Sequence, residues 1–143
     1  MAEYIYIPEQ TVQVGQGVLL NGSTPCNRGN VYHQDGSALF TLKGPGNNGC
    51  FARYQVTFRA NIAVPAEGTV GEISVAIARS GEIQGQSLAA ITPAAVNQFG
   101  NVTSTSYITV PKGCGCFNIS VRNSSEDTAI LVRNANLVIT RIA

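Results

Sequence analysis

The sequence is poor in the side chains that most enzyme and metal sites use. It has no Trp, one His and one Met, and only 12% of its 143 residues are charged. Globular proteins ordinarily carry about 25% charged residues. Either Asn, Gln, Ser and Thr solvate the surface in place of charges, or part of the surface is hidden in an oligomer. We favour the oligomer.

Clusters of positive charge and long apolar runs are also absent. The nine Lys and Arg residues are scattered singly, and the net charge is +1. Nucleic-acid binding requires clustered cations that displace counterions, so we expect no nucleic-acid partner. No run approaches the roughly 18 apolar residues of a membrane span, so we expect no membrane insertion. Residues 1–8 lack the basic region and apolar stretch of a secretory signal, which predicts synthesis in the cytoplasm.

Helical periodicity is missing as well, since the nearest helix-like segment, residues 87–99, is interrupted by Pro93. Short β-branched runs alternate with Gly, Pro, Asn and Ser, which is typical of antiparallel sandwiches. The expected strands are residues 3–7, 11–20, 30–33, 38–43, 50–64, 70–79, 82–90, 101–110, 116–122, 129–133 and 136–142. Without crossover helices, they predict an all-β fold: one domain, residues 1–143, with two antiparallel sheets joined as a jelly-roll sandwich.

Local signals refine this prediction at several points. Asp35-Gly36 predicts a tight turn, and Ser80-Gly81 predicts a hairpin that leads into residues 82–90. Asn21-Gly22 is expected to be a loop. In the longest run the alternation places Tyr54 and Phe58 on one face of the strand, which we expect to point inward.

Two C-terminal runs are apolar on both faces of the expected strands, at residues 129–132 and 137–139. An antiparallel sandwich normally leaves one face of each strand in water. The second face is covered either by a long loop of the same chain or by another copy, and both interpretations stay open. The candidate residues for an interface between copies are Tyr4, Tyr6, Ile130, Val132 and Val138.

The last third of the chain resembles a known pattern. Its segments are, in order, Val102–Val110, Pro111-Lys112-Gly113, Asn118–Asn123 and Asn134–Ala143. This succession of a strand, Val-Pro-x-Gly, a strand and Asn-Ala-x-Leu-x-Ile-x-Arg is similar to the closing strands of C1q/TNF-like jelly rolls. Bacterial members include the C-terminal domains of collagen-like spore-surface proteins. The wider chain also resembles small uncharacterised proteins of gut Firmicutes and their phages.

The resemblance implies a homotrimer that decorates a surface or binds a partner. The Gly-X-Y stalk of collagen-like members is missing, so residues 1–16 become the candidate arm for attachment or strand exchange. The expected function is a non-enzymatic structural trimer on a particle, in first place a phage capsid or head, located at the virion surface. The alternative is a recognition module of a bacterial cell or spore surface that binds protein or glycan through its loops.

Motifs of catalysis or metal binding do not emerge. His33, the single histidine, has no nucleophile elbow beside it and is interpreted as a surface or hydrogen-bonded residue near a turn. Glu126 and Asp127 indicate a polar turn, because a calcium site needs six to eight oxygen ligands. Residues 44–49 lack the Lys and the helix of a phosphate-binding loop. We expect no enzymatic activity, no catalytic residue, no metal and no cofactor.

The four cysteines leave two alternatives open. Cys114 and Cys116 are closer together than the usual ligands of a structural zinc site, and Cys26 and Cys50 are distant in sequence. Cys26 and Cys50 each form a disulfide with Cys114 or Cys116, or all four are free thiols.

The five tyrosines mostly fit alternating core positions. Tyr4 and Tyr6 share one face of an N-terminal strand and are the best candidates for exposure. They form either an aromatic platform for carbohydrate or part of a strand that docks on a neighbour.

Overall fold

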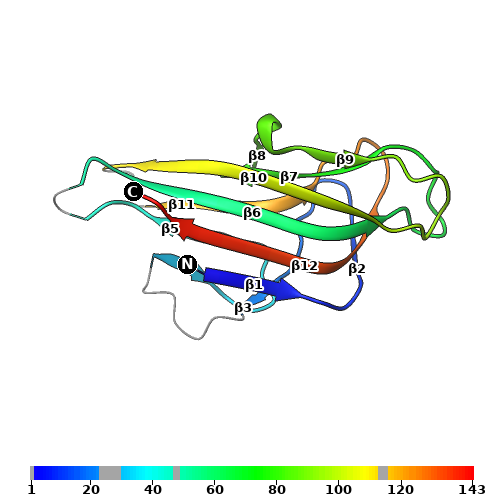
Figure 1. Ribbon diagram of the computed structural model, residues 1–143, viewed down its shortest axis with the longest axis horizontal. Helices are drawn as coiled ribbons and strands as arrows, with labels where there is room; N and C mark the ends of the chain where they lie inside the picture. The colour runs from blue at the N-terminus through cyan, green and yellow to red at the C-terminus, as the bar shows by residue number, and fades with distance from the viewer. Residues whose placement is uncertain (1, 23–29, 47–48, 113–115) are drawn as a thin grey trace.

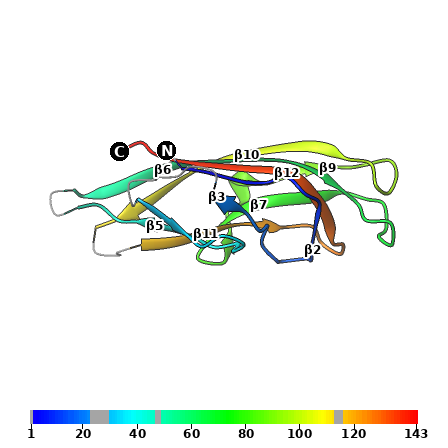
Figure 2. The same ribbon diagram turned by 90° about the horizontal axis from the view of Figure 1, so that it is seen from below.

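The chain forms two antiparallel sheets packed face to face, and the computed structural model describes residues 2–22, 30–46, 49–112 and 116–143 (Figures 1 and 2). Sheet A contains β1 (Ala2–Tyr6), β2 (Gln10–Val12), β3 (Asn21–Gly22), β6 (Phe51–Ala63), β10 (Gly100–Pro111) and β12 (Ile130–Arg141). Sheet B contains β4 (Val31–His33), β5 (Phe40–Lys43), β7 (Ile73–Arg79), β8 (Glu82–Ile83), β9 (Ala89–Ile91) and β11 (Cys116–Asn123). A short 3₁₀ turn, η1 (Gly85–Ser87), lies between β8 and β9.

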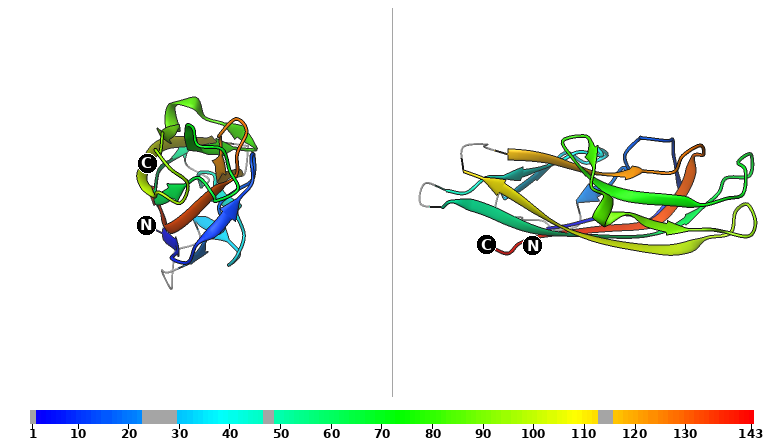
Figure 3. Two further views of the ribbon diagram at one scale, coloured as in Figure 1. Left: turned by 90° about the vertical axis from the view of Figure 1, so that its right-hand side faces the viewer. Right: turned by 90° about the horizontal axis from the view of Figure 1, so that it is seen from above.

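The chain crosses repeatedly from one sheet to the other. Sheet A has the order β10-β6-β12-β1-β3, with β2 also paired to β12, and sheet B has the order β4-β5-β11-β7-β8, with β9 beside β7. Viewed end-on, the two layers curve around a common interior (Figure 3). The prediction of an all-β, two-sheet jelly roll is confirmed.

Alternation along the long strands builds the core. On β6, Tyr54, Val56 and Phe58 are fully buried, and on β7, Ile73 and Ile77 are as well. Full burial of an apolar side chain of this size contributes roughly 1.5–3 kcal/mol of transfer free energy. The inward face predicted for the longest strand, β6, is confirmed.

The two predicted tight turns are present. Gly36 has a φ of 80°, and Ser80 and Gly81 have φ values of 51° and 85°. Two consecutive residues with positive φ are typical of the hairpin turn whose twist matches antiparallel strands, and Ser80-Gly81 joins β7 to β8. The hairpin prediction is therefore confirmed, although η1 interrupts the returning strand.

The segment 11–20 is not one strand, which corrects the prediction. β2 ends at Val12, and the chain then crosses to sheet B, where Gly17 forms a bridge with Arg122. A Cβ at Gly17 would lie 2.6 Å from the Cβ of Ala38, so only glycine fits this crossing without a shift. Residues 21–22, expected to be a loop, form β3 and pair with β1.

The two expected C-terminal strands are in fact one strand, β12. The register on β6 shifts between Arg133 and Asn136, and Asn134 has a φ of 54°. Asn tolerates this left-handed conformation better than most residues do. The Asn134 amide donates to the Ile7 carbonyl at 3.1 Å, so the irregularity is held without ending the strand.

The N-terminal segment is part of sheet A. All five residues of β1 pair with β12, and β2 pairs with the first residues of the same strand. The role of residues 1–16 as an arm for attachment or strand exchange stays a prediction.

Candidate interaction surface

The structure places three of the five predicted interface residues inside the chain. Ile130 and Val132 have no exposed surface, and Tyr4 is 4% exposed. Tyr6 and Val138 are half-buried, and Val138 alternates with the inward-facing residues of β12, so it faces outward. The proposal that Tyr4, Ile130 and Val132 contact another copy is therefore corrected, because the chain's own core covers them. For Tyr6 and Val138 it stays a prediction.

The exposed tyrosines also differ from the expectation. Tyr4 makes edge contacts with the rings of His33 and Phe40, at centroid distances of 4.8 and 4.7 Å. Tyr32 and Tyr107 are the tyrosines with more than half of their surface exposed among the described residues. The burial of Tyr4 excludes it from an aromatic platform, whereas Tyr6 is only partly buried.

Large apolar side chains gather on the outer face of sheet A at one end of β6. We define the outer-sheet patch as Phe51, Arg53, Tyr107, Val138 and Ile142. Phe51, Tyr107 and Ile142 are 47%, 53% and 47% exposed. The patch spans three adjacent strands and the last residues after β12.

Strand pairing brings this patch together from distant parts of the sequence. The Arg53 guanidinium carbon lies 5.4 Å from the centre of the Tyr107 ring, within the range of a cation–π contact. The Ile142 amide donates to the Arg53 carbonyl at 2.8 Å, which fixes the C-terminal residues beside β6. Tyr107 lies opposite Gln55 on the neighbouring strand. The Tyr107 ring and the residues after β12 thus both lie beside Arg53.

The rest of this face carries mainly neutral polar groups. The Thr57 and Thr105 hydroxyls are 3.3 Å apart, and Asn61 donates to Asn134 at 3.2 Å. Asn136 donates to a Glu3 carboxylate oxygen at 3.0 Å. Hydroxyl and amide groups therefore cover this face between its exposed cations, which include Arg59 and Arg133.

Sequence reasoning missed the patch, although one signal was available. Phe51 and Tyr107 occupy the positions of their strands that alternate with the buried residues, so they fall on the polar face. A large apolar residue at such a position indicates a contact beyond the chain's own core. The signal was overlooked because Phe51 and Tyr107 are far apart in sequence.

His33 packs against the core near the predicted turn. Its Nε2 atom lies 2.9 Å from the Ser37 carbonyl oxygen, and its ring stacks on Phe40 with centroids 4.1 Å apart. These contacts agree with the interpretation of His33 as a hydrogen-bonded residue beside a turn.

Tyr54 joins the two sheets at the end of the core nearest the patch. Its hydroxyl donates to the Lys43 carbonyl at 2.7 Å, which links β6 of sheet A to β5 of sheet B. Burial raises the pKa of this phenol above its ordinary value, and the positive charge of Arg141 opposes that effect. The neutral phenol is therefore the form that the folded state favours.

Glu126 and Asp127 lie at the opposite end of the molecule, in loops around a hollow of about 820 Å³. Within the described ranges, no group of three or more His, Cys, Asp or Glu residues could hold a metal ion. No helix in those ranges is long and apolar enough to cross a membrane. These observations concern the described residues alone.

The structure describes only one of the four cysteine side chains on which the disulfide prediction depends. Cys50 is exposed and its thiol is free. Cys26, Cys114 and the side chain of Cys116 lie outside the described residues. The choice between disulfides and free thiols stays a prediction.

Comparison with known proteins gives matches in structure and none in sequence: no family model and no curated protein matches the chain. The Eiger TNF structure from S. frugiperda aligns with a TM-score of 0.68 at 12% identity, covering 100% of this chain and 92% of that one. Murine APRIL aligns with a TM-score of 0.56 at 10% identity, covering 95% and 97%. The C-terminal domain of the sugar-binding protein EclA reaches a TM-score of 0.35, which is too low to support an argument.

The strand order and these likenesses define a β-sandwich module of the jelly-roll class. More narrowly, the chain has a C1q/TNF-like jelly-roll fold, as the closing strands suggested. At these identities the likeness concerns the fold alone, so function has to be argued from the surface.

Proposed function

We propose that this chain is a non-enzymatic assembly module that forms a homotrimer through the outer face of sheet A. The observation that carries the proposal is the outer-sheet patch, in which Phe51, Tyr107 and Ile142 are each about half exposed around Arg53. Interface cores are enriched in aromatic residues and Arg and depleted of other charges. The trimeric state itself rests on the resemblance to C1q/TNF-like jelly rolls.

The faces that the trimer leaves free would then contact the surface of a larger particle. We propose that it decorates a particle, with a phage head as the first candidate and the virion surface as its location. The low charge and the exposed apolar side chains on the outer face of sheet A support assembly, and the choice of a phage particle rests on the resemblance to phage proteins.

A second candidate function is recognition of a partner through the loops on a bacterial cell or spore surface. The hollow of about 820 Å³ among the loops favours it, because concave sites bind ligands more often than flat ones do. The two functions predict different locations in a producing culture. Antibody against the chain should label intact particles in a density gradient if it decorates them, and cells or spores if it is a recognition module.

The trimer is tested by replacing one of two exposed tyrosines on opposite sheets. We expect Tyr107→Glu to convert a trimer into monomers in sedimentation velocity, because the carboxylate would be buried in the contact. Tyr32→Glu, on β4 of sheet B, is the matched control and should leave the mass unchanged. A wild-type monomer at micromolar concentration, or equal effects of both variants, would contradict the proposal.

A further inference from the structure

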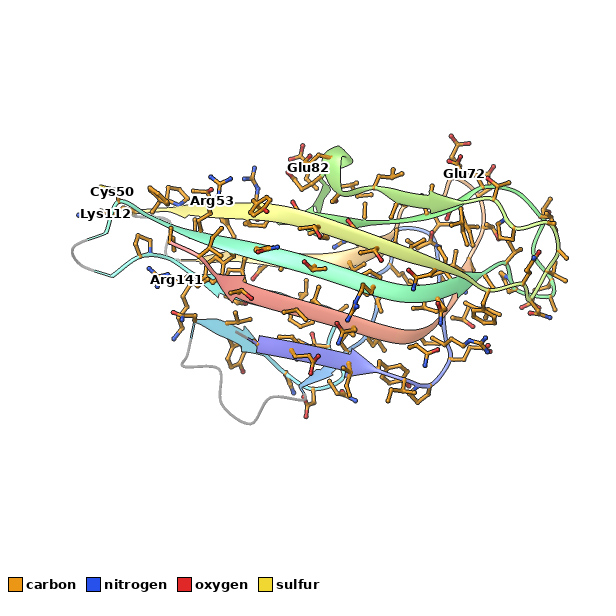
Figure 4. The ribbon with its side chains drawn as sticks, in the orientation of Figure 1. Cys50, Arg53, Glu72, Glu82, Lys112 and Arg141 are labelled. Atoms are coloured by element: carbon orange, nitrogen blue, oxygen red, sulfur yellow. The ribbon has the colours of Figure 1, made fainter. Side chains whose placement is uncertain are left out.

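Charged side chains of opposite sign collect at opposite ends of the long axis. We define the basic end as Lys43, Lys112 and Arg141, all of which are exposed. Figure 4 shows Lys112 and Arg141 at one end of the molecule and Glu72 toward the other. The pattern is invisible in the sequence, where these cations are scattered.

Side-chain hydrogen bonds fix two parts of the basic end. The Lys43 carbonyl accepts the Tyr54 hydroxyl at 2.7 Å, and the Arg141 guanidinium donates to the Ala143 carbonyl at 3.0 Å and to the Asn30 side chain at 3.4 Å. The Asn30 acceptor is neutral and the Arg141 side chain stays exposed, so its guanidinium remains accessible to an outside carboxylate.

The opposite end is hollowed and acidic. The hollow of about 820 Å³ is bordered by Glu67, Glu72, Glu126 and Asp127, and no Lys, Arg or His lines it among the described residues. All four acids are exposed. We refer to this region as the acidic hollow.

The acidic hollow also has apolar surface. Val70 and Leu88 are 45% and 48% exposed and contribute to its lining. A Lys or Arg side chain places an alkyl stem on apolar surface while its charged head stays with polar groups. Carboxylates beside exposed aliphatic groups therefore suit long cationic side chains on a partner surface.

We propose that the basic end of one copy docks into the acidic hollow of a second copy. The two surfaces have complementary charge, and both are present on every molecule. The net charge of +1 leaves little overall repulsion between copies. Such a contact joins different patches of the two partners, so it does not close on itself and continues as a row.

The contact depends on exposed charges, so it is individually weak and sensitive to salt. It uses the two ends of the molecule and does not require the trimer. If the protein is trimeric, three parallel contacts strengthen the association through avidity.

The first measurement is the weight-average mass by sedimentation velocity at two salt concentrations. The Debye length is about 30 Å at 0.01 M and about 3 Å at 1 M ionic strength, so the charges act across the contact only at the lower value. We expect the mass to grow with protein concentration at low salt and to return to a constant value at high salt. A weight-average mass that does not differ between the two salt concentrations would overturn the proposal.

A charge exchange tests the pairing directly. The double variant Lys43→Glu with Lys112→Glu removes the net positive charge of the basic end, and Glu72→Lys with Asp127→Lys removes the net negative charge of the acidic hollow. Neither variant should associate alone at low salt, whereas an equimolar mixture should form pairs, because each variant keeps the end that the other has lost. A mixture that remains unassociated would refute docking of the basic end in the acidic hollow.

The matched control is Glu82→Lys, which changes the net charge as Glu72→Lys does but lies away from both ends (Figure 4). It should preserve the salt-dependent growth of the weight-average mass, whereas Glu72→Lys should weaken that growth. Equal losses in the two variants would show a net-charge effect and overturn the proposal. The mass at high salt reports the trimer separately, so failure of one proposal is distinguishable from failure of the other.

Discussion

The two sheets of this molecule differ in length and in what their outer faces present. β6, β10 and β12 of sheet A have 13, 12 and 12 residues, whereas the longest strands of sheet B, β11 and β7, have 8 and 7. The outer face of sheet A carries the outer-sheet patch. On sheet B, the residues of β7 that alternate with its core side chains are Ser74, Ala76 and Ala78, and they are almost fully buried.

The chain itself covers the edge of the shorter sheet. β8 and β9 both pair with β7, and the Ile77 amide donates to the Ser87 hydroxyl at 2.9 Å. Backbone groups that could pair with another molecule are thus satisfied internally. The comparison teaches that sheet A is the side suited to contacts with other molecules. It also raises the question of whether the two sheets unfold as one cooperative unit.

The largest expected effect comes from removing a buried ring on either sheet. Phe58→Ala on sheet A and Phe40→Ala on sheet B should each lower the free energy of unfolding by about 3–5 kcal/mol, because both side chains are fully buried. Chemical denaturation followed by circular dichroism should show one cooperative transition for each variant. A separate early transition in the Phe40 variant alone would show that the sheets unfold independently.

Tyr54→Phe removes the hydroxyl that links the sheets. The Lys43 carbonyl then loses a partner, and we expect a loss of about 1–3 kcal/mol in the free energy of unfolding. The pH dependence provides a second readout. Since the folded state raises the pKa above 10.0, the phenol contributes stability that is complete below pH 10.0 and is lost as the pH rises through the folded pKa.

Wild type should therefore lose stability more steeply than Tyr54→Phe in denaturation curves recorded across that alkaline range. Tyr32→Phe is the matched control, since this ring is 66% exposed. If the Tyr54 variant keeps the full alkaline slope of the wild type, the raised pKa does not contribute to stability.

Gly17→Ala tests the segment that crosses between the sheets. The added methyl group would meet the Ala38 side chain at 2.6 Å, so we expect destabilisation by about 1–3 kcal/mol from overpacking. The thermal midpoint measures it. Gly46→Ala is a control, because a Cβ there meets nothing within 4 Å. Equal midpoints for both variants would mean that the crossing adjusts freely.

The smallest effect is expected from two inward-facing serines of β10. The Ser104 hydroxyl donates to the Ser87 carbonyl and so connects sheet A with η1, whereas the buried Ser106 hydroxyl has no hydrogen-bond partner among the described residues. Ser104→Ala should cost about 1 kcal/mol, and Ser106→Ala should be neutral or stabilising. Urea denaturation of both variants gives the difference, and the reverse order would contradict these assignments.

Much of the fold was predictable because its signals are local. The alternation of β6 identified its buried face, and Asp35-Gly36 and Ser80-Gly81 identified turns. The region of residues 11–22 was predicted wrongly, since its pairing partners lie on β1 and β11, distant in sequence. A local pattern contains no information about such partners.

The sequence by itself determined the jelly-roll class and the scarcity of catalytic groups, since alternation, turn residues and composition are properties of the linear chain. Only the tertiary structure decided which apolar side chains are core and which are surface. Ile130 and Val138 look equivalent on an apolar strand, yet the opposing sheet covers only the first completely. It also decided where charges meet, because cations that are isolated along the chain converge when strands pair. Local propensity acts within a few residues, whereas burial and charge clusters depend on contacts between distant ones.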